Sequence, residues 1–185
     1  MAYTDKTNVL AVGTGEISVG AKVSTGLELE ATWTSKLTSL EGTCKISQAA
    51  DTVNKIKIDQ SDAPIGVTRT KGEVTIEFDL PNTASAMWTK FYNSASGTAA
   101  MYSVTAGKTV NGIVMTTKYL SDMLRIKMKN GGQTFIFPNL DWGTLFKKDS
   151  ETNPACFTVS CTVLGTIDST NPDMIIVTDQ DGSAA

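Results

Sequence analysis

Three carboxylates on one stretch come closest to the spacing that catalysis needs. Glu73, Glu77 and Asp79 alternate with apolar residues between Lys71 and Leu80. Paired carboxylates hydrolyse glycosides when their carboxyl groups lie within about 10 Å of each other. Residues i and i+4 of a strand lie ~13 Å apart, so Glu73 and Glu77 do not form such a pair by themselves. Acids from separate strands could still meet, but nothing in the sequence marks them.

The chain contains no histidine. Ser-His-Asp and Cys-His nucleophiles, HExxH sites and histidine-ligated metals all need an imidazole, so its own residues cannot build them. Cys44, Cys156 and Cys161 are expected to be reduced and mostly buried. Cys156 and Cys161 differ by an odd number of positions and face opposite sides of a regular strand, so they share no metal. No catalytic, cofactor-binding or metal-binding residues are predicted.

Two glycine-containing segments resemble nucleotide-binding motifs but lack the required neighbours. Gly13-Thr14-Gly15 begins like a dinucleotide fingerprint, yet Ser18 stands at the third glycine position and no helical pattern follows. Gly107-Lys108-Thr109 ends like a P-loop, yet Tyr102 stands at the first glycine position. A turn or bulge in a sheet accounts for the first segment. A hairpin turn, supported by Asn111-Gly112, accounts for the second.

The stretch from Lys55 to Ala95 carries the clearest structural pattern. Lys55–Asp59 and Lys71–Leu80 alternate polar and apolar residues, which is typical of strands with one buried face. In the second strand, the alternate apolar residues from Val74 to Leu80 are expected to face the core. The polar residues between them, from Glu73 to Asp79, are expected to face water or a water-filled cavity. Turn-forming residues predict a long turn over Gln60–Gly66.

A helix is predicted over about residues 83–95, after Pro81-Asn82-Thr83 ends the strand. Asn82 or Thr83 is the expected N-cap and Gly97 the expected terminator. The apolar residues recur at helical spacing and form one stripe that should lie on a sheet. The stripe consists of Ala84, Met87, Trp88, Phe91, Tyr92 and Ala95.

Most of the remaining chain reads as short strands. They are expected at about residues 9–19, 26–33, 44–47, 99–104, 113–120, 123–129, 133–137, 156–164 and 174–177. Pro138–Asp149 reads as a connection against which Trp142 and Phe146 pack. One domain spans residues 1–185, with an arm at about 1–8 and a flexible tail at about 180–185. The predicted fold is mainly β: an antiparallel β-sandwich or barrel with one flanking α-helix.

Charge narrows the range of partners. The chain has 19 acidic and 16 basic residues, a net charge of −3, which disfavours a sequence-specific DNA-binding protein. One strand, Met123–Lys129, carries Arg125, Lys127 and Lys129 on one face. A solvated or ion-paired face and a nucleic-acid contact are both compatible with it. No signal peptide is expected, and no run reaches the ~18 apolar residues of a membrane span.

The order of these elements resembles that of the tail tube, or major tail, proteins of long-tailed bacteriophages. The resemblance is carried by KIKIDQSDAPIGVTRTKGEVTIEFDLPN, residues 55–82. More loosely, it is carried by QTFIFPN at 133–139, by Thr144–Asp149 and by the strand Cys156–Leu164. It runs in order over about residues 10–165, whereas the basic strand and the segment after Gly165 have no counterpart.

The resemblance implies a β-sandwich subunit that assembles into hexameric rings. These rings stack into a hollow tube in the virion tail, and assembly takes place in the host bacterial cytoplasm. The implied partners are other copies of the chain, the tape-measure protein, the tail terminator and the baseplate or tip proteins. Double-stranded DNA passes through the tube without sequence-specific binding. The resemblance implies neither catalysis nor a cofactor.

Within that resemblance, an acidic strand face is a candidate channel wall, because acids repel the DNA backbone and let it slide. The candidate lumen residues are Glu73, Glu77 and Asp79, with Glu28 and Glu30 next, and plain solvent exposure is the alternative. The candidate inter-subunit residues are Gln60, Ser61, Asp62, Pro64, Arg125, Lys127 and Lys129. The three cations are hypothesised to pair with acids of an adjacent subunit.

Two other functions stay open on the sequence. One is the tube of a contractile injection system, which carries no DNA. The other is a carbohydrate-binding β-sandwich, which would need an exposed tryptophan as a stacking platform. Of Trp33, Trp88 and Trp142, Trp88 lies on the apolar stripe of the predicted helix, so Trp142 is the best candidate platform.

Overall fold

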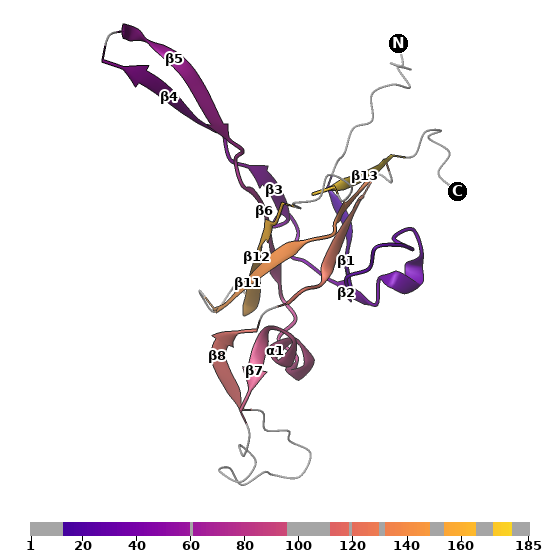
Figure 1. Cartoon of the computed structure of the whole chain (residues 1–185). Helices are drawn as coiled ribbons and strands as arrows, with labels where there is room; N and C mark the ends of the chain where they lie inside the picture. Colours follow the sequence, from indigo (N-terminus) through magenta and orange to yellow (C-terminus); the bar gives the residue numbers. More distant parts are fainter. Residues whose placement is uncertain are drawn as a thin grey trace, which may run out of the picture.

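Two antiparallel sheets form the body of the protein (Figure 1). The computed structural model describes residues 13–59, 61–95, 112–118, 120–129, 132–148, 154–165 and 172–178, with the backbone alone for residues 58, 61, 62 and 117. The first sheet has the order β13(Ile175–Thr178)-β10(Gln133–Phe137)-β9(Met123–Met128)-β1(Thr14–Gly20)-β2(Ser35–Leu37). The second has the order β11(Leu140–Lys147)-β12(Cys156–Val163)-β6(Val74–Leu80)-β3(Lys45–Gln48).

Two hairpins and two short helices complete the described elements. The hairpins pair β4(Thr52–Ile58) with β5(Ser61–Thr70) and β7(Tyr92–Ser94) with β8(Ile113–Thr117). The helices are the 3₁₀-helix η1(Glu30–Thr32) and the α-helix α1(Ser85–Phe91). This architecture confirms the prediction of a mainly β, antiparallel fold of the sandwich kind with one flanking α-helix.

The core lies between the inner faces of the two sheets. Burying each large apolar side chain there stabilises the fold by about 1.5–3 kcal/mol. The first sheet contributes Ile17, Val19, Leu124, Ile126 and Phe137, and the second contributes Ile76, Phe78, Leu80, Phe157 and Val159. The prediction for β6 is confirmed, because its apolar residues face this core whereas Glu73 and Glu77 are exposed.

Helix α1 is held against the second sheet by aromatic side chains. The Trp88 ring lies edge-on to the Phe157 ring at a centroid distance of 4.9 Å and lies 4.6 Å from the Phe146 ring. The Tyr92 hydroxyl, just after the helix, accepts a hydrogen bond from the backbone N–H of Phe146 and donates one to the carbonyl of Thr144. The helix therefore covers the part of β11 and β12 that carries Phe146 and Phe157.

The helix is shorter than the predicted span of about residues 83–95. Ala84 is its N-cap, and Asn82 instead accepts from the backbone N–H of Ala84 at 3.0 Å, in the turn before the helix. At the other end, Tyr92 adopts an extended conformation and begins β7, which pairs with β8. Strand pairing thus ends the helix before the apolar stripe runs out. Gly97, the predicted terminator, lies outside the described residues.

The predicted strand at 26–33 is wrong: the segment forms turns and the 3₁₀-helix η1. Its side chains bond to its own backbone, since Trp33 Nε1 donates to the carbonyl of Leu27 and Thr32 Oγ1 donates to that of Gly26. Such local bonds compete with sheet pairing. A Cβ on Gly20 of β1 would overlap the carbonyl oxygen of Thr32, so the segment packs directly on the sheet.

Two predicted connections are strands. Pro138–Asp149 contains β11, which pairs with β12 along its whole length, although Trp142 and Phe146 do pack as predicted. The predicted long turn Gln60–Gly66 is also wrong, because β5 begins at Ser61. Ile58 pairs with Ser61, so only residues 59 and 60 connect the strands. The segment 61–66 was not predicted to be a strand because proline, glycine and aspartate indicate turns more often than strands.

Other predictions agree with the structure or fall outside it. The strands β10, β12 and β13 match the predicted ones within about one residue. The predicted turn or bulge near Gly15 appears as a register shift between Thr14 and Glu16 in the pairing of β1 with β9. The arm at 1–8, the strand at 99–104, the turn at 107–109 and the tail at 180–185 lie outside the described residues.

We predict that Gly72→Ala destabilises the base of the β4–β5 hairpin by about 1–3 kcal/mol. A Cβ on Gly72 would overlap the backbone carbonyl of Ala49, and the backbone N–H of Gly72 donates to the Asp51 carboxylate. Urea unfolding followed by tryptophan fluorescence measures the change. Gly66→Ala in β5 is the control, because its Cβ would only touch Ile56 at an ordinary 3.6 Å. Equal effects of the two substitutions would refute the prediction.

Candidate functional site

The outer face of the second sheet carries the predicted acidic residues. Strand register aligns Ser47, Thr75 and Thr162 across β3, β6 and β12, and it aligns Glu77 with Ser160. The hydroxyls of Ser47 and Thr75 are 2.9 Å apart and share a hydrogen bond. Hydroxyl side chains therefore make up much of this face, and the exposed Lys45 of β3 stands on it directly opposite Glu77 of β6.

The three predicted lumen acids lie on the same side of the segment 73–79 but are not equivalent. Glu73 and Glu77 are exposed. Asp79 is half-buried, accepts a 2.6 Å hydrogen bond from the Thr158 hydroxyl and lies 3.9 Å from the Lys147 ammonium. Glu73 and Glu77 take part in none of the ion pairs among described side chains, although Lys45 lies opposite Glu77 in the register, whereas part of the charge of Asp79 is neutralised by Lys147.

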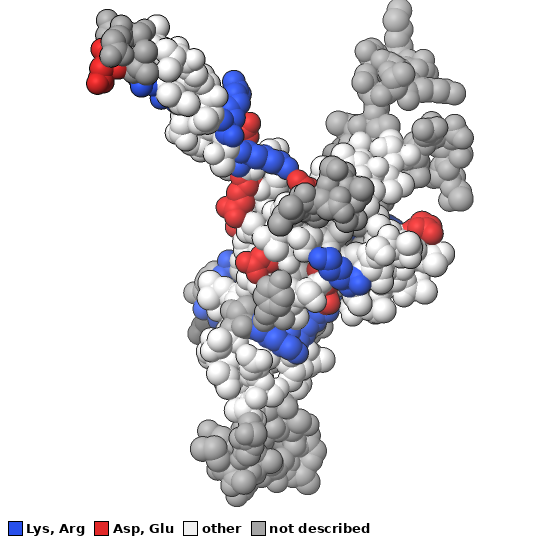
Figure 2. Space-filling model, in the orientation of Figure 1, with Lys and Arg blue, Asp and Glu red and all other residues white. Residues whose placement is uncertain are grey.

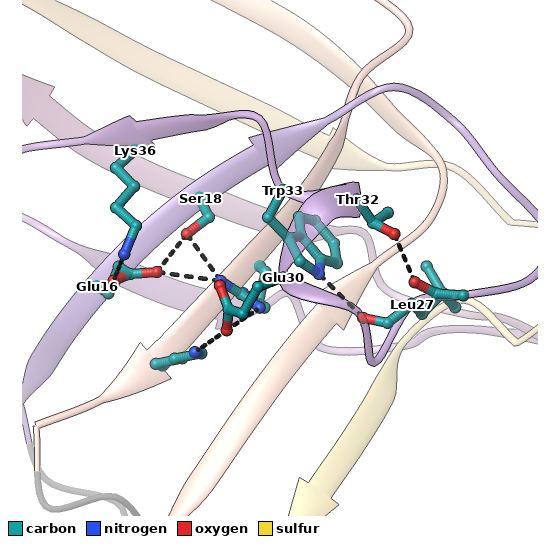
Figure 3. Close-up of polar contacts among 10 residues, drawn as sticks. Glu16, Ser18, Leu27, Glu30, Thr32, Trp33 and Lys36 are labelled. Carbon is teal, nitrogen blue, oxygen red and sulfur yellow. Dashed lines mark hydrogen bonds and ion pairs between the residues drawn. The ribbon is translucent and has the colours of Figure 1, made fainter.

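The outer face of the first sheet holds a network of ion pairs around Arg125 (Figure 3). The Arg125 side chain is 4% exposed, and its guanidinium bonds both carboxylate oxygens of Glu30, at 3.1 and 3.0 Å. It also bonds Glu16 at 3.1 Å and the Ser18 hydroxyl at 3.3 Å. It lies over the Trp33 ring at 4.9 Å, a cation–π distance.

Two lysines extend this network. Lys127 lies 2.7 Å from Glu30, and Lys36 lies 2.8 Å from Glu16. Figure 3 shows Lys36, Glu16 and Ser18 on β2 and β1, with Glu30 beside them on the segment that carries Trp33. The network therefore fastens the 26–33 segment to the sheet.

The network holds both of its carboxylates in the ionised form. The hydrogen bonds from Arg125 and then Lys127 lower the pKa of Glu30 from its ordinary value of 4.5 to about 2. The hydrogen bonds from Lys36 and then Ser18 lower the pKa of Glu16 to about 2 as well. Both acids therefore stay charged and paired throughout the neutral and mildly acidic range.

The predicted basic face of Met123–Lys129 meets acids of its own chain. Arg125 and Lys127 bond Glu16 and Glu30, while Lys129 is exposed. A contact of this face with an adjacent subunit stays a prediction. Glu30, a second-rank lumen candidate, lies with this network on the opposite outer face of the sandwich from Glu73 and Glu77, so in one subunit these acids do not line the same wall.

The β4–β5 hairpin carries the other predicted inter-subunit residues and projects away from both sheets (Figure 1). Pro64 is exposed in β5, Ser61 and Asp62 are described by their backbone alone, and Gln60 lies outside the described residues. Large aliphatic side chains of the hairpin are open to solvent. They are Val53 (43% exposed), Ile56 (47%), Ile65 (60%) and Val67 (54%).

Two of the three tryptophans are enclosed by the body. Trp142 is 3% exposed and donates from Nε1 to the carbonyl of Asp122, and Trp33 is 4% exposed. Trp88 packs on Phe146 and Phe157. The prediction that Trp142 offers the best stacking platform for a sugar is therefore wrong, because a buried ring has no free face.

A hollow of about 660 Å³ opens beside β1, β2 and the 38–44 segment. Its lining mixes Lys36, Glu41 and Lys129 with Ile17 and with backbone near the glycines of β1. Among the described residues, no three Cys, Asp or Glu side chains gather as metal ligands. The hollow therefore has charged walls, to which Glu16, Lys36, Glu41 and Lys129 contribute.

No family model matches the chain, and no curated protein matches it. In the described part of the chain, none of the helices has the length and hydrophobicity that crossing a membrane requires.

We predict that acid weakens the fold through Glu16 and Glu30. Their folded-state pKa values lie near 2, below the ordinary 4.5, so their stabilising contribution is complete above about pH 5 and is lost as the pH falls from there towards 2. Urea midpoints at pH 6, 4 and 3 should decline, and the decline should be smaller in Glu16→Gln/Glu30→Gln. Glu28→Gln, exposed beside η1, is the control. Equal pH profiles for all three proteins would contradict the assignment.

Proposed function

We propose that the chain is a structural subunit of a bacteriophage tail tube, which assembles into stacked hexameric rings around a channel for genome delivery. The observation that carries this proposal is the β4–β5 hairpin, which leaves the body and exposes four large aliphatic side chains. An isolated two-stranded hairpin is only marginally stable in water. A chain built in this way gains stability when another subunit covers the hairpin.

The edges of the second sheet support the same proposal. β3 is an edge strand of that sheet, and all four of its residues are exposed. An exposed edge presents unpaired backbone donors and acceptors that pair readily with a strand of another chain. Edge pairing between neighbours would continue the sheet from subunit to subunit, as the closed wall of a ring requires.

The two outer faces of the sandwich differ, and the difference favours one of them as the channel wall. On the first sheet, the 26–33 segment packs on β1 and β9 through the Arg125 network. On the second sheet, hydroxyl side chains, the carboxylates of Glu73 and Glu77 and one lysine, Lys45, form the surface. The carboxylates of such a wall repel DNA phosphates, which favours the sliding of DNA along it.

The proposed partners follow from that role. They are other copies of the chain, the tape-measure protein, the tail terminator, the baseplate or tip proteins and the double-stranded DNA that passes through. The proposed location is the virion tail, built in the host bacterial cytoplasm, and the role requires no catalysis. The tube of a contractile injection system would have the same kind of subunit, and the acidic wall favours the tube that carries DNA.

We predict that the purified protein forms rings or tubes as its concentration rises. Burial of the hairpin and pairing of the β3 edge supply the free energy of association. Negative-stain electron microscopy shows the particles, and sedimentation velocity over a hundredfold concentration range gives their mass. A protein that stays strictly monomeric across that range would overturn the proposed function.

We predict that Glu77→Lys slows DNA passage without preventing assembly. A lysine on the channel wall attracts phosphates that the glutamate repels. The measurement is the rate of triggered genome release from virions whose tube consists of the variant, with tube length checked by microscopy. Glu28→Lys changes the charge equally but lies beside η1 at the opposite outer face, so release should stay normal. Equal release rates would show that β6 does not face the channel.

A further inference from the structure

The two faces of the β4–β5 hairpin differ in charge. Strand register pairs Val53 with Arg69 and Lys55 with Val67, and side chains of directly opposed residues project to the same side. These four residues form what we call the cationic face. Between Thr52 and Ile56, before the register shift, the alternating pairs form the neutral face, which consists of Thr52, Asn54, Ile56, Gly66, Thr68 and Thr70.

The charges of the cationic face are not paired within the described part of the chain. Lys55 and Arg69 are exposed, and the ion pairs among described side chains involve other cations. On the first sheet, by contrast, Arg125 and Lys127 are bound to carboxylates of their own chain. The hairpin thus exposes three cations, Lys55, Lys57 and Arg69, together with two aliphatic side chains of the cationic face, Val53 and Val67.

A second copy of the chain has the complementary charge. The chain has three more acidic than basic residues. The exposed carboxylates that take part in none of the ion pairs among described side chains are those of Glu28, Glu41, Asp51, Asp59, Glu73, Glu77 and Asp141. Figure 2 shows basic side chains along the hairpin and acidic side chains at its tip and near its base. Opposite charges around a desolvated apolar centre set the orientation of a protein–protein contact.

We infer that the cationic face of the hairpin docks on an acidic surface of a second copy, whereas the neutral face makes no comparable contact. This inference rests on the proposed function and adds to it the side of the hairpin on which the neighbour lies. Because the hairpin of one copy meets the body of the next, each copy keeps one donor and one acceptor surface. Such a heterologous contact propagates from copy to copy, into a closed ring or an open stack.

Two double variants with equal charge change test which face docks. Lys55→Gln/Arg69→Gln and Asn54→Glu/Thr68→Glu each lower the net charge by two, on opposite faces of the same strands. We expect the first variant to raise the concentration needed for half-maximal assembly by roughly tenfold, because two interfacial ion pairs are lost. The second should stay within about twofold of the wild type. Sedimentation velocity measures both, and circular dichroism checks that both are folded.

A zero-length carbodiimide cross-link identifies the surface that receives the hairpin. Assembled particles of mixed ¹⁴N and ¹⁵N chains should yield cross-linked peptides of mixed isotope that join Lys55 to a carboxylate. Assembled particles in which other lysines cross-link between copies but Lys55 does not would overturn the inference.

The outcomes separate the two proposals. A wild-type protein that never assembles overturns the proposed function and the docking together. Assembly that both double variants weaken equally, or that the neutral-face variant weakens more, overturns the docking alone.

Discussion

The apolar face of β6 is the constraint on which the rest of the structure depends. Ile76, Phe78 and Leu80 are at most 1% exposed and pack against the first sheet. A one-residue slip of β6 would bury its carboxylates in the core, so its register is strongly fixed. Because β6 pairs with both β12 and β3, its register positions the acidic outer face, and the chain segments at its two ends lead to the hairpin and to α1.

Residues 74–80 could be predicted because local and tertiary preferences agree there. Alternation sends Phe78 inwards and Glu77 outwards, and burial in the sandwich requires the same arrangement. The 26–33 segment shows the opposite case. Its alternation indicates a strand, but Trp33 and Thr32 bond to nearby carbonyls, and Gly26 adopts φ +75 in the turn. These bonds form only when the segment folds back on itself in a turn, and an alternating polar–apolar pattern does not predict such a turn.

The network around Arg125 could not be predicted for a related reason. The alternation correctly placed Arg125 and Lys127 on one side of β9, but Arg125 meets Glu16 and Glu30, which are 109 and 95 positions away in the sequence. Only the pairing of β1 with β9 brings Ser18 and Glu16 beside them. From the sequence alone, the basic residues of β9 therefore indicate a surface that binds a partner. In the structure, Arg125 of this strand is instead enclosed by carboxylates of its own chain. The β4–β5 hairpin could not be predicted either. Pro64 and Gly66 indicate a turn, although they lie within the strand β5.

Cations that are paired within the chain and cations that are not lie on different parts of the structure. Enclosing an arginine costs desolvation that good partner geometry offsets, and Arg125 has Glu16, Glu30 and Ser18 around it. On the first sheet, Arg125 and Lys127 thus bind carboxylates of their own chain, whereas Lys129 is exposed. On the hairpin, Lys55, Arg69 and the neighbouring aliphatic side chains all face water. The contrast between an enclosed arginine on one sheet and exposed cations on the projecting hairpin supports the proposal that another chain covers the hairpin. The exposed carboxylates of an identical chain have the chemistry to cover it.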